Sequence, residues 1–250
     1  FMAGHSHWAG IKHKKGKADK QKSKIFSKLS KEITVAAKMG SSDSSTNPRL
    51  RSAIESAKEA NMPKDNIERA IKKSEIDPNV NYSSIVYEGF GPEKIAVIVE
   101  ALTDNKNRTA SNIRTLFQKN GGNLGESGVA AHQFSQVGVI RIDKNKISEN
   151  DILELAINGG AEDCISSGVH HEIITLKENF YKVKTEISKK VQQFISAGIE
   201  WLPINKVSLN EEKTKSVLNF LEILEEDDDV QYVYANLEID NNSLIKISKW

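Results

Sequence analysis

The spacing of the apolar residues changes near Asp77-Pro78, and this change constrains the fold more than any other feature of the sequence. Before this point, apolar residues recur every three or four positions, as in Leu50, Ala53 and Ala57, which is the spacing of an amphipathic helix. After it, alternating apolar residues and a mostly apolar run at 95–102 that only Glu100 interrupts indicate strands. We therefore expect an all-helical N-terminal region followed by an α+β region.

Turn signals divide the first 80 residues into three helices. The first is predicted from residue 23 to a cap at Gly40, and the second begins at Asn47-Pro48, an N-cap followed by proline at the first helical position. Asn61-Met62-Pro63 repeats this signal before a third helix that runs to Ser74. Residues 4–24 carry few apolar side chains and are predicted to form a basic arm ahead of the helices.

The remainder of the chain alternates strands and helices. Strands are predicted at 83–87, 95–102, 129–134 and 137–142, with a helix at 107–119 and a flexible glycine-rich connector at 121–128. Six further elements are predicted in order: strand 138–142, a helix around 152–157, strands 164–167 and 172–176, a helix at 180–196 and a strand at 200–206. This β-α-β-β-α-β order predicts a ferredoxin-like unit.

The last segment could complete the sheet that starts at residue 83. It supplies a predicted helix at 211–225 and strands at 230–236 and 244–247. The predicted domains are therefore a basic arm with an all-α domain at 1–80, a discontinuous α+β domain at 81–137 and 208–250, and a ferredoxin-like domain inserted at 138–207.

Charge is distributed unevenly along the chain. The whole chain has a net charge of +1, but residues 1–80 hold 17 Lys or Arg and 9 Asp or Glu, which gives +8, and the remainder carries −7. A basic end can seek a polyanion while an acidic remainder keeps the molecule soluble and limits indiscriminate binding. This polarity favours a partner rich in phosphate.

Other classes of protein are not indicated. The sequence has no run of about 18 apolar residues and starts without the apolar segment of a secretory signal, so no membrane partner is expected. The single cysteine, Cys164, cannot form an internal disulfide, which agrees with a reducing compartment. We expect a cytoplasmic protein of bacterial type.

The arm and the start of the first helix hold the densest cationic cluster. Nine lysines lie between Lys12 and Lys31, and Asp19 is the only acid before Glu32. Such an arm can follow phosphates while Trp8 stacks on a base or sugar, although a solvated tail that aids solubility is the alternative. The predicted nucleic-acid-binding residues here are Trp8, Lys12, His13, Lys14, Lys15, Lys17, Lys20, Lys22 and Lys24.

Further cations on the predicted helices extend this prediction. Helices two and three resemble a pair of helices that reads a DNA groove. They add six cations to the predicted interface: Arg49, Arg51, Lys64, Arg69, Lys72 and Lys73. The alternative is that these cations form the solvent-exposed face of each helix and pair with nearby glutamates. Asn105 and Arg108 stand at a helix start, where backbone N–H groups can bind an anion. The alternative at this start is simple capping by Asn105 or Asn107.

Metal, cofactor and catalytic sites are not indicated. His5, His7 and His13 lack carboxylate or cysteine partners at ligand spacing, and His170 and His171 would point to opposite faces of a strand. The 121–128 loop lacks the Lys-Ser/Thr ending of a nucleotide loop. No nucleophile–base pair is recognisable, and residues 225–229 are expected to form a solvated acidic turn. We expect no enzyme activity, no cofactor, no metal and no small-molecule substrate.

Several stretches of the sequence together resemble the YebC family. They are residues 2–8, Ile11-Lys12-His13, Lys24-Ile25-Phe26, Glu32-Ile33, Asn47-Pro48-Arg49-Leu50-Arg51, and residues 61–73, 99–105 and 121–125. The block at 61–73 is very specific. The resemblance implies an all-helical domain and two α+β domains, one inserted in the other, in a group described as probable bacterial transcriptional regulators that bind promoter DNA. Other members look like translation factors that act on the ribosome.

The sequence departs from the family pattern at a few positions. His7 stands where Lys is usual, Gly10 where Asn is usual and Ser74 where Gly is usual, so the arm loses one cation but keeps its preference for phosphate. The leading prediction is a DNA-binding transcriptional regulatory protein that acts through a Lys-rich N-terminal module. A translation factor that binds ribosomal RNA is the close alternative, and an adaptor that binds proteins through the acidic half is a minor one.

Overall fold

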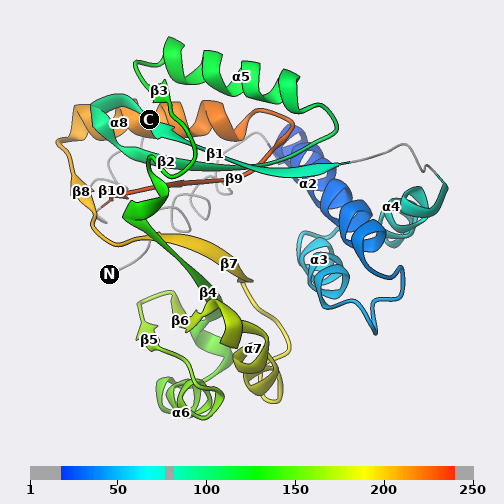
Figure 1. Ribbon diagram of the computed structural model, residues 1–250. Helices are drawn as coiled ribbons and strands as arrows, with labels where there is room; N and C mark the ends of the chain where they lie inside the picture. Colours follow the sequence, from blue (N-terminus) through cyan, green and yellow to red (C-terminus); the bar gives the residue numbers. More distant parts are fainter. Residues whose placement is uncertain (1–17, 77–81, 240–250) are drawn as a thin grey trace. The chain divides into compact units, whose positions relative to one another are not determined.

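The computed structural model describes residues 18–76 and 82–239, and side chains within residues 23–74 and 82–239. These residues form two compact units, one at 135–202 and the other made of the described residues on both sides of it. Figure 1 shows the elements of each unit in sequence colours. Among the described helices, none combines the length and the hydropathy needed to cross a membrane.

The described part of the chain begins with three helices, as predicted. They are α2 (Ala18–Met39), α3 (Pro48–Glu59) and α4 (Lys64–Ile76), and they share a core built around Ile33, Leu50 and Ala57. Helix α2 begins at Ala18 rather than near residue 23, so the backbone of Lys20 and Lys22, which the sequence assigned to the arm, is helical and the predicted boundary between arm and helix is wrong.

Asn47 fixes the turn between α2 and α3. Its Oδ1 accepts a hydrogen bond from Leu50 N at 3.1 Å, which confirms the predicted N-cap, and its Nδ2 donates to Ala36 O and Ser41 O at 2.8 Å each. A Cβ at Gly40 would lie 2.6 Å from Asn47 Nδ2, so only glycine leaves room for this side chain. The short Asn47 side chain therefore closes both helix ends.

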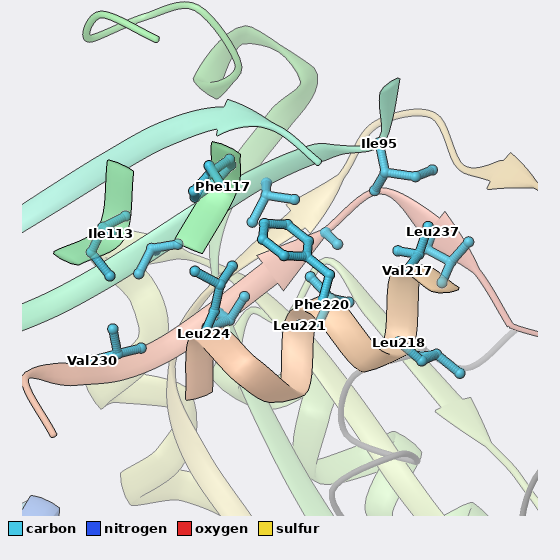
Figure 2. Packing of buried hydrophobic residues seen from close by; sticks show 14 residues of the cluster. Ile95, Ile113, Phe117, Val217, Leu218, Phe220, Leu221, Leu224, Val230 and Leu237 are labelled. Carbon is cyan, nitrogen blue, oxygen red and sulfur yellow. The ribbon is translucent and has the colours of Figure 1, made fainter. Parts of the chain in front are cut away.

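The next region is a four-stranded sheet with its helices on one face. Its strands β1 (Ser83–Phe90), β2 (Ala96–Thr103), β3 (Asn123–Leu124) and β9 (Val230–Ala235) lie in the order β3-β1-β2-β9. Helices α5 (Lys106–Lys119) and α8 (Glu211–Glu225) pack on it through a shared core (Figure 2). In this core the rings of Phe117 and Phe220 pack edge to face, with 5.0 Å between their centroids. Strand β9 pairs with β2 although more than 100 residues separate them, so this sheet is discontinuous in sequence.

Residues 135–202 form the ferredoxin-like unit that the sequence predicts. Its elements are β4 (Phe134–Asp143), α6 (Glu149–Gly159), β5 (Asp163–Ser166), β6 (His170–Leu176), α7 (Phe180–Ser188) and β7 (Ser196–Pro203), and the strand order is β5-β6-β4-β7. The two helices pack on the sheet through Ile140, Ile173 and Val183. The protein is thus an α+β protein with three N-terminal helices and two separate four-stranded sheets.

Three predicted elements differ in the structure. Residues 129–133 are not a strand but a turn followed by a 3-10 helix, Ala131–Gln133, and strand β4 begins at Phe134. Helix α7 stops at Ser188 instead of reaching residue 196, because Ile195 N–H donates to Arg141 O and the chain must extend to join the sheet. The strand predicted at 200–206 therefore lies earlier, at β7. The strand predicted at 244–247 lies outside the described residues.

A short parallel pair of strands lies within the unit that contains the three helices. Strands β8 (Val207–Ser208) and β10 (Leu237–Glu238) pair in parallel beside α8. Further 3-10 turns occur at Pro92–Lys94, Lys144–Lys146 and Lys177–Asn179.

Candidate nucleic-acid interface

Part of the predicted interface lies beyond what the structure describes. Trp8, Lys12, His13, Lys14, Lys15 and Lys17 fall outside the described residues, and Lys20 and Lys22 have a described backbone on α2 but no described side chain. The role of these residues in binding stays a prediction. The candidate interface that the structure does describe starts at Lys24.

Three lysines on α2 face the end of α8. Lys24, Lys28 and Lys31 are spaced by four and three residues, so they lie on one face of the helix; we call them the lysine face. Lys24 Nζ donates to Glu226 O at 3.0 Å and Lys28 Nζ to Glu225 O at 3.1 Å. These main-chain oxygens belong to the C-terminal end of α8, where carbonyls lack partners within the helix.

Lys31 makes the third contact and adds an ion pair. Its Nζ donates to Asp228 O at 2.7 Å and to Asp229 Oδ1 at 3.0 Å. The side chain of Asp229 is only 7% exposed, so residues 225–229, which we call the acidic turn, are not the wholly solvated turn that the sequence suggested. The sequence holds no local signal for this contact, because 198 residues separate its partners.

The predicted anion site at the start of α5 holds an anion from the protein itself. Arg108 Nη2 lies 2.7 Å from Asp229 Oδ2, and Thr109 Oγ1 donates to the same oxygen at 2.8 Å. Asn105 caps the helix by accepting from Arg108 N at 3.0 Å, which is the alternative that the sequence left open. Arg108 also pairs with Asp104 at 2.9 Å.

These cations hold Asp229 in its charged form. Burial would raise its pKa, but hydrogen bonds from Arg108, Lys31 and Thr109 outweigh burial and lower the pKa to about 2. Arg108 in turn has a raised pKa, mainly because of its hydrogen bond to Asp229. One carboxylate therefore joins α2, α5 and the start of β9 through charge-assisted hydrogen bonds.

The predicted arginines of α3 are engaged in local contacts. Arg49 binds Glu32 on α2 with two hydrogen bonds, from Nε at 2.7 Å and from Nη2 at 3.1 Å. Arg51 donates to the main-chain oxygens of Ser44 and Ser45 at 3.1 and 3.0 Å. Both arginines thus brace the α2–α3 connection, although Arg51 is exposed enough to meet a further acceptor.

Helix α4 presents a more open set of cations. Lys64 lies 3.6 Å from Glu68 in an exposed pair, and Arg69 donates to Asn66 Oδ1 at 2.6 Å. Lys72 and Lys73 are exposed, and within the described part of the chain they make no ion pair. The ammonium groups of Lys72 and Lys73 are therefore open to solvent, and their role in binding stays a prediction.

The glycine-rich loop at 121–128 is not a phosphate cradle, and it is not a flexible connector either. It contains strand β3, and the buried Glu88 carboxylate accepts from Gly128 N, Ala130 N and Ala131 N at 2.8–3.0 Å. Burial would raise the pKa of Glu88, but these N–H groups outweigh burial, so the pKa lies below its ordinary value. An anion of the protein already occupies these donors.

The buried arginine of the ferredoxin-like unit is paired with two carboxylates of the same unit. Buried Arg141 binds Glu172 at 2.7 Å and Glu200 at 2.6 Å, and His171 lies between Ser166 Oγ and Ile147 O. No group of three or more His, Cys, Asp or Glu is arranged to hold a metal ion anywhere in the described ranges.

Comparison with known proteins places the whole described chain in one family. A family model described as the TACO1/YebC protein N-terminal domain matches residues 6–76, and one described as the TACO1/YebC second and third domain matches residues 82–237. The chain is similar to a probable transcriptional regulatory protein of Pelagibacter ubique, with 61% identity over 96% of this chain and 100% of that protein. Its fold is similar to the crystal structure of the conserved hypothetical protein Aq1575 of Aquifex aeolicus, with a TM-score of 0.84 and 47% identity over 94% of this chain and 98% of the other. The chain therefore belongs to the TACO1/YebC family.

Proposed function

We propose that this chain is a cytoplasmic, non-enzymatic transcriptional regulator that binds DNA through its lysine-rich N-terminal module. The observation that carries the proposal is the concentration of nine lysines between Lys12 and Lys31, continued by exposed Lys72 and Lys73 on α4. Lysines bind phosphates as point charges and release condensed counterions when they do so. The name of the Pelagibacter ubique relative supports the assignment to transcription.

The proposed contacts are with the phosphate backbone rather than with base edges. Asn61 and Asn66 are the amides near α4 that could read an adenine, but Asn61 has a φ of 58° in the turn before α4 and Asn66 accepts from Arg69. Phosphate contacts position a protein on a duplex without reading its sequence. Any preference for promoters would therefore depend on DNA shape or on a second protein.

Phosphate binding also suits a translation factor bound to ribosomal RNA, and the target in the cell decides between the two. Cells that express the full chain would be crosslinked, and the attached nucleic acid would be sequenced. Recovery of promoter fragments supports the proposal, and recovery of ribosomal RNA replaces it with the translational alternative.

The same crosslinking experiment tests the lysine-rich module. A variant with glutamine at four arm lysines should lose most of the recovered nucleic acid: Lys12, Lys14, Lys15 and Lys17. A matched control changes four exposed lysines elsewhere and should keep it: Lys119, Lys144, Lys146 and Lys182. Equal losses in the two variants would contradict the proposed module.

A further inference from the structure

The C-terminal end of helix α8 lacks a basic residue of its own to stabilise it. Helices α2, α3, α4 and α5 each carry a lysine in the last turn, whereas α6, α7 and α8 carry no basic residue there, and α8 also runs into the acidic turn. The C-terminal end of a helix bears a partial negative charge and unpaired carbonyls, which favour cations. Five consecutive acidic residues at this end therefore create a strongly negative surface that needs cations from elsewhere.

The lysine face supplies these cations. Its three ammonium groups bind main-chain oxygens of Glu225, Glu226 and Asp228, and Lys31 also binds the Asp229 carboxylate. The side chain of Lys31 is 17% exposed, so much of its charge is already matched by the protein. A hollow of about 440 Å³ beside these contacts is lined by Lys31, Arg108 and the aspartates of the acidic turn.

We infer that the acidic turn is a built-in competitor of nucleic acid for the lysine face. This inference rests on the proposed function, because it concerns lysines of the same module. The main-chain oxygens of the turn and the Asp229 carboxylate occupy the ammonium groups in the way that phosphate oxygens would. A phosphate chain that reaches these lysines must displace the turn, so the contact lowers the affinity for nucleic acid and favours ligands with dense phosphate.

The competition predicts a gain in binding when the turn loses its charge. The test variant replaces Glu225 and Glu226 by Gln and Asp227 and Asp228 by Asn, and it keeps Asp229, which also binds Arg108 and Thr109. The matched control makes the same change in net charge elsewhere, by replacing four exposed glutamates with Gln: Glu126, Glu154, Glu162 and Glu178. Both would be titrated with a short DNA duplex and with a single-stranded RNA of the same length.

The expected result is tighter binding by the turn variant than by the control, on the order of tenfold. Its salt dependence should also steepen, by up to about 0.9 in the logarithmic slope for each lysine released to a phosphate. The gain should disappear when Lys24, Lys28 and Lys31 are also changed to Gln. Affinity and slope equal to those of the control, or a gain that survives loss of the three lysines, would overturn the inference.

The outcomes separate this inference from the proposed function. If the turn variant behaves like its control while the Lys12, Lys14, Lys15 and Lys17 variant loses binding, the competition is wrong and the function stands. If the turn variant gains binding while the arm variant keeps it, the competition stands and the arm is not the binding module. If no variant binds either nucleic acid, both are wrong.

Discussion

Asp229 connects several elements of the unit that contains the three N-terminal helices. It accepts hydrogen bonds from Lys31 on α2, from Arg108 and Thr109 on α5, and from Thr103 at the end of β2. Changing it to Asn should destabilise the protein at neutral pH by about 1–2 kcal/mol, because Lys31 and Arg108 lose a shared counter-charge; partial exposure of both cations limits the loss. Urea unfolding would measure it.

The contribution of the Asp229 charge should depend on pH in a defined direction. Its pKa is lowered from 3.8 to about 2, so the stabilisation is complete above the unfolded value and is lost as the pH falls through the folded value. The difference in free energy of unfolding between the native protein and D229N should therefore shrink between about pH 4 and pH 2. Asp228→Asn, an exposed change in the same turn, is the control. A difference that stays constant over this range would contradict the account.

The Glu88 carboxylate accepts hydrogen bonds from backbone N–H groups at the end of the glycine-rich loop and just after it. Replacing it with Gln removes the charge and one acceptor oxygen, which leaves donors among Gly128, Ala130 and Ala131 poorly satisfied. We expect a loss of about 1–3 kcal/mol in the free energy of unfolding, and faster hydrogen exchange at these three amides. Exposed Glu126→Gln in the same loop should change neither quantity. Unchanged exchange in E88Q would show that the carboxylate does not hold the loop.

At the scale of elements, the two asparagine caps of α3 and α8 should differ in strength. Exposed Asn210 caps α8 through one bond to Lys213 N, and its change to Ala should cost about 1 kcal/mol. Buried Asn47 caps α3 and also satisfies two carbonyls, so Asn47→Ala should cost on the order of 2–3 kcal/mol. Urea unfolding of both variants tests this, and equal losses would contradict the double role of Asn47.

Elements with local signals were predictable from the sequence. Asn47-Pro48 predicts the start of α3, the spacing of Val217, Leu221 and Leu224 predicts α8, and the β-α-β-β-α-β order predicts the ferredoxin-like unit. The strand predicted at 129–134 fails because Glu88, more than 40 residues earlier, captures the N–H groups that a strand would need. A contact at that separation leaves no local pattern in the sequence.

The candidate site also has features that the sequence predicts and contacts that it does not. The concentration of lysines can be read directly from the sequence, and capping by Asn105 or Asn107 is the alternative that the sequence offers at the start of α5. The contacts of Arg49 with Glu32, and of Arg108 and Lys31 with Asp229, cannot, because tertiary folding brings these acids close. For the same reason the acidic turn looks like a solvated loop in the sequence, whereas its last residue is buried among cations in the structure.

At the scale of the whole molecule, the uneven charge has two consequences. The +8 of residues 1–80 can attract a phosphate chain, and the −7 of the remainder supplies the acidic turn that engages part of this charge. A protein of this kind should bind nucleic acid with an affinity that depends strongly on salt. It should bind less strongly than the number of its lysines alone suggests.

The salt dependence of duplex binding by the full chain tests the central claim most directly. Between about 50 and 200 mM salt, six phosphate contacts would lower the affinity on the order of a thousandfold. Gln at Lys12, Lys14, Lys15 and Lys17 should flatten the logarithmic slope by about 3–4, whereas Gln at Lys119, Lys144, Lys146 and Lys182 should leave it unchanged. An arm variant that keeps the affinity and the slope of the native protein would contradict the claim that this module binds the phosphate backbone.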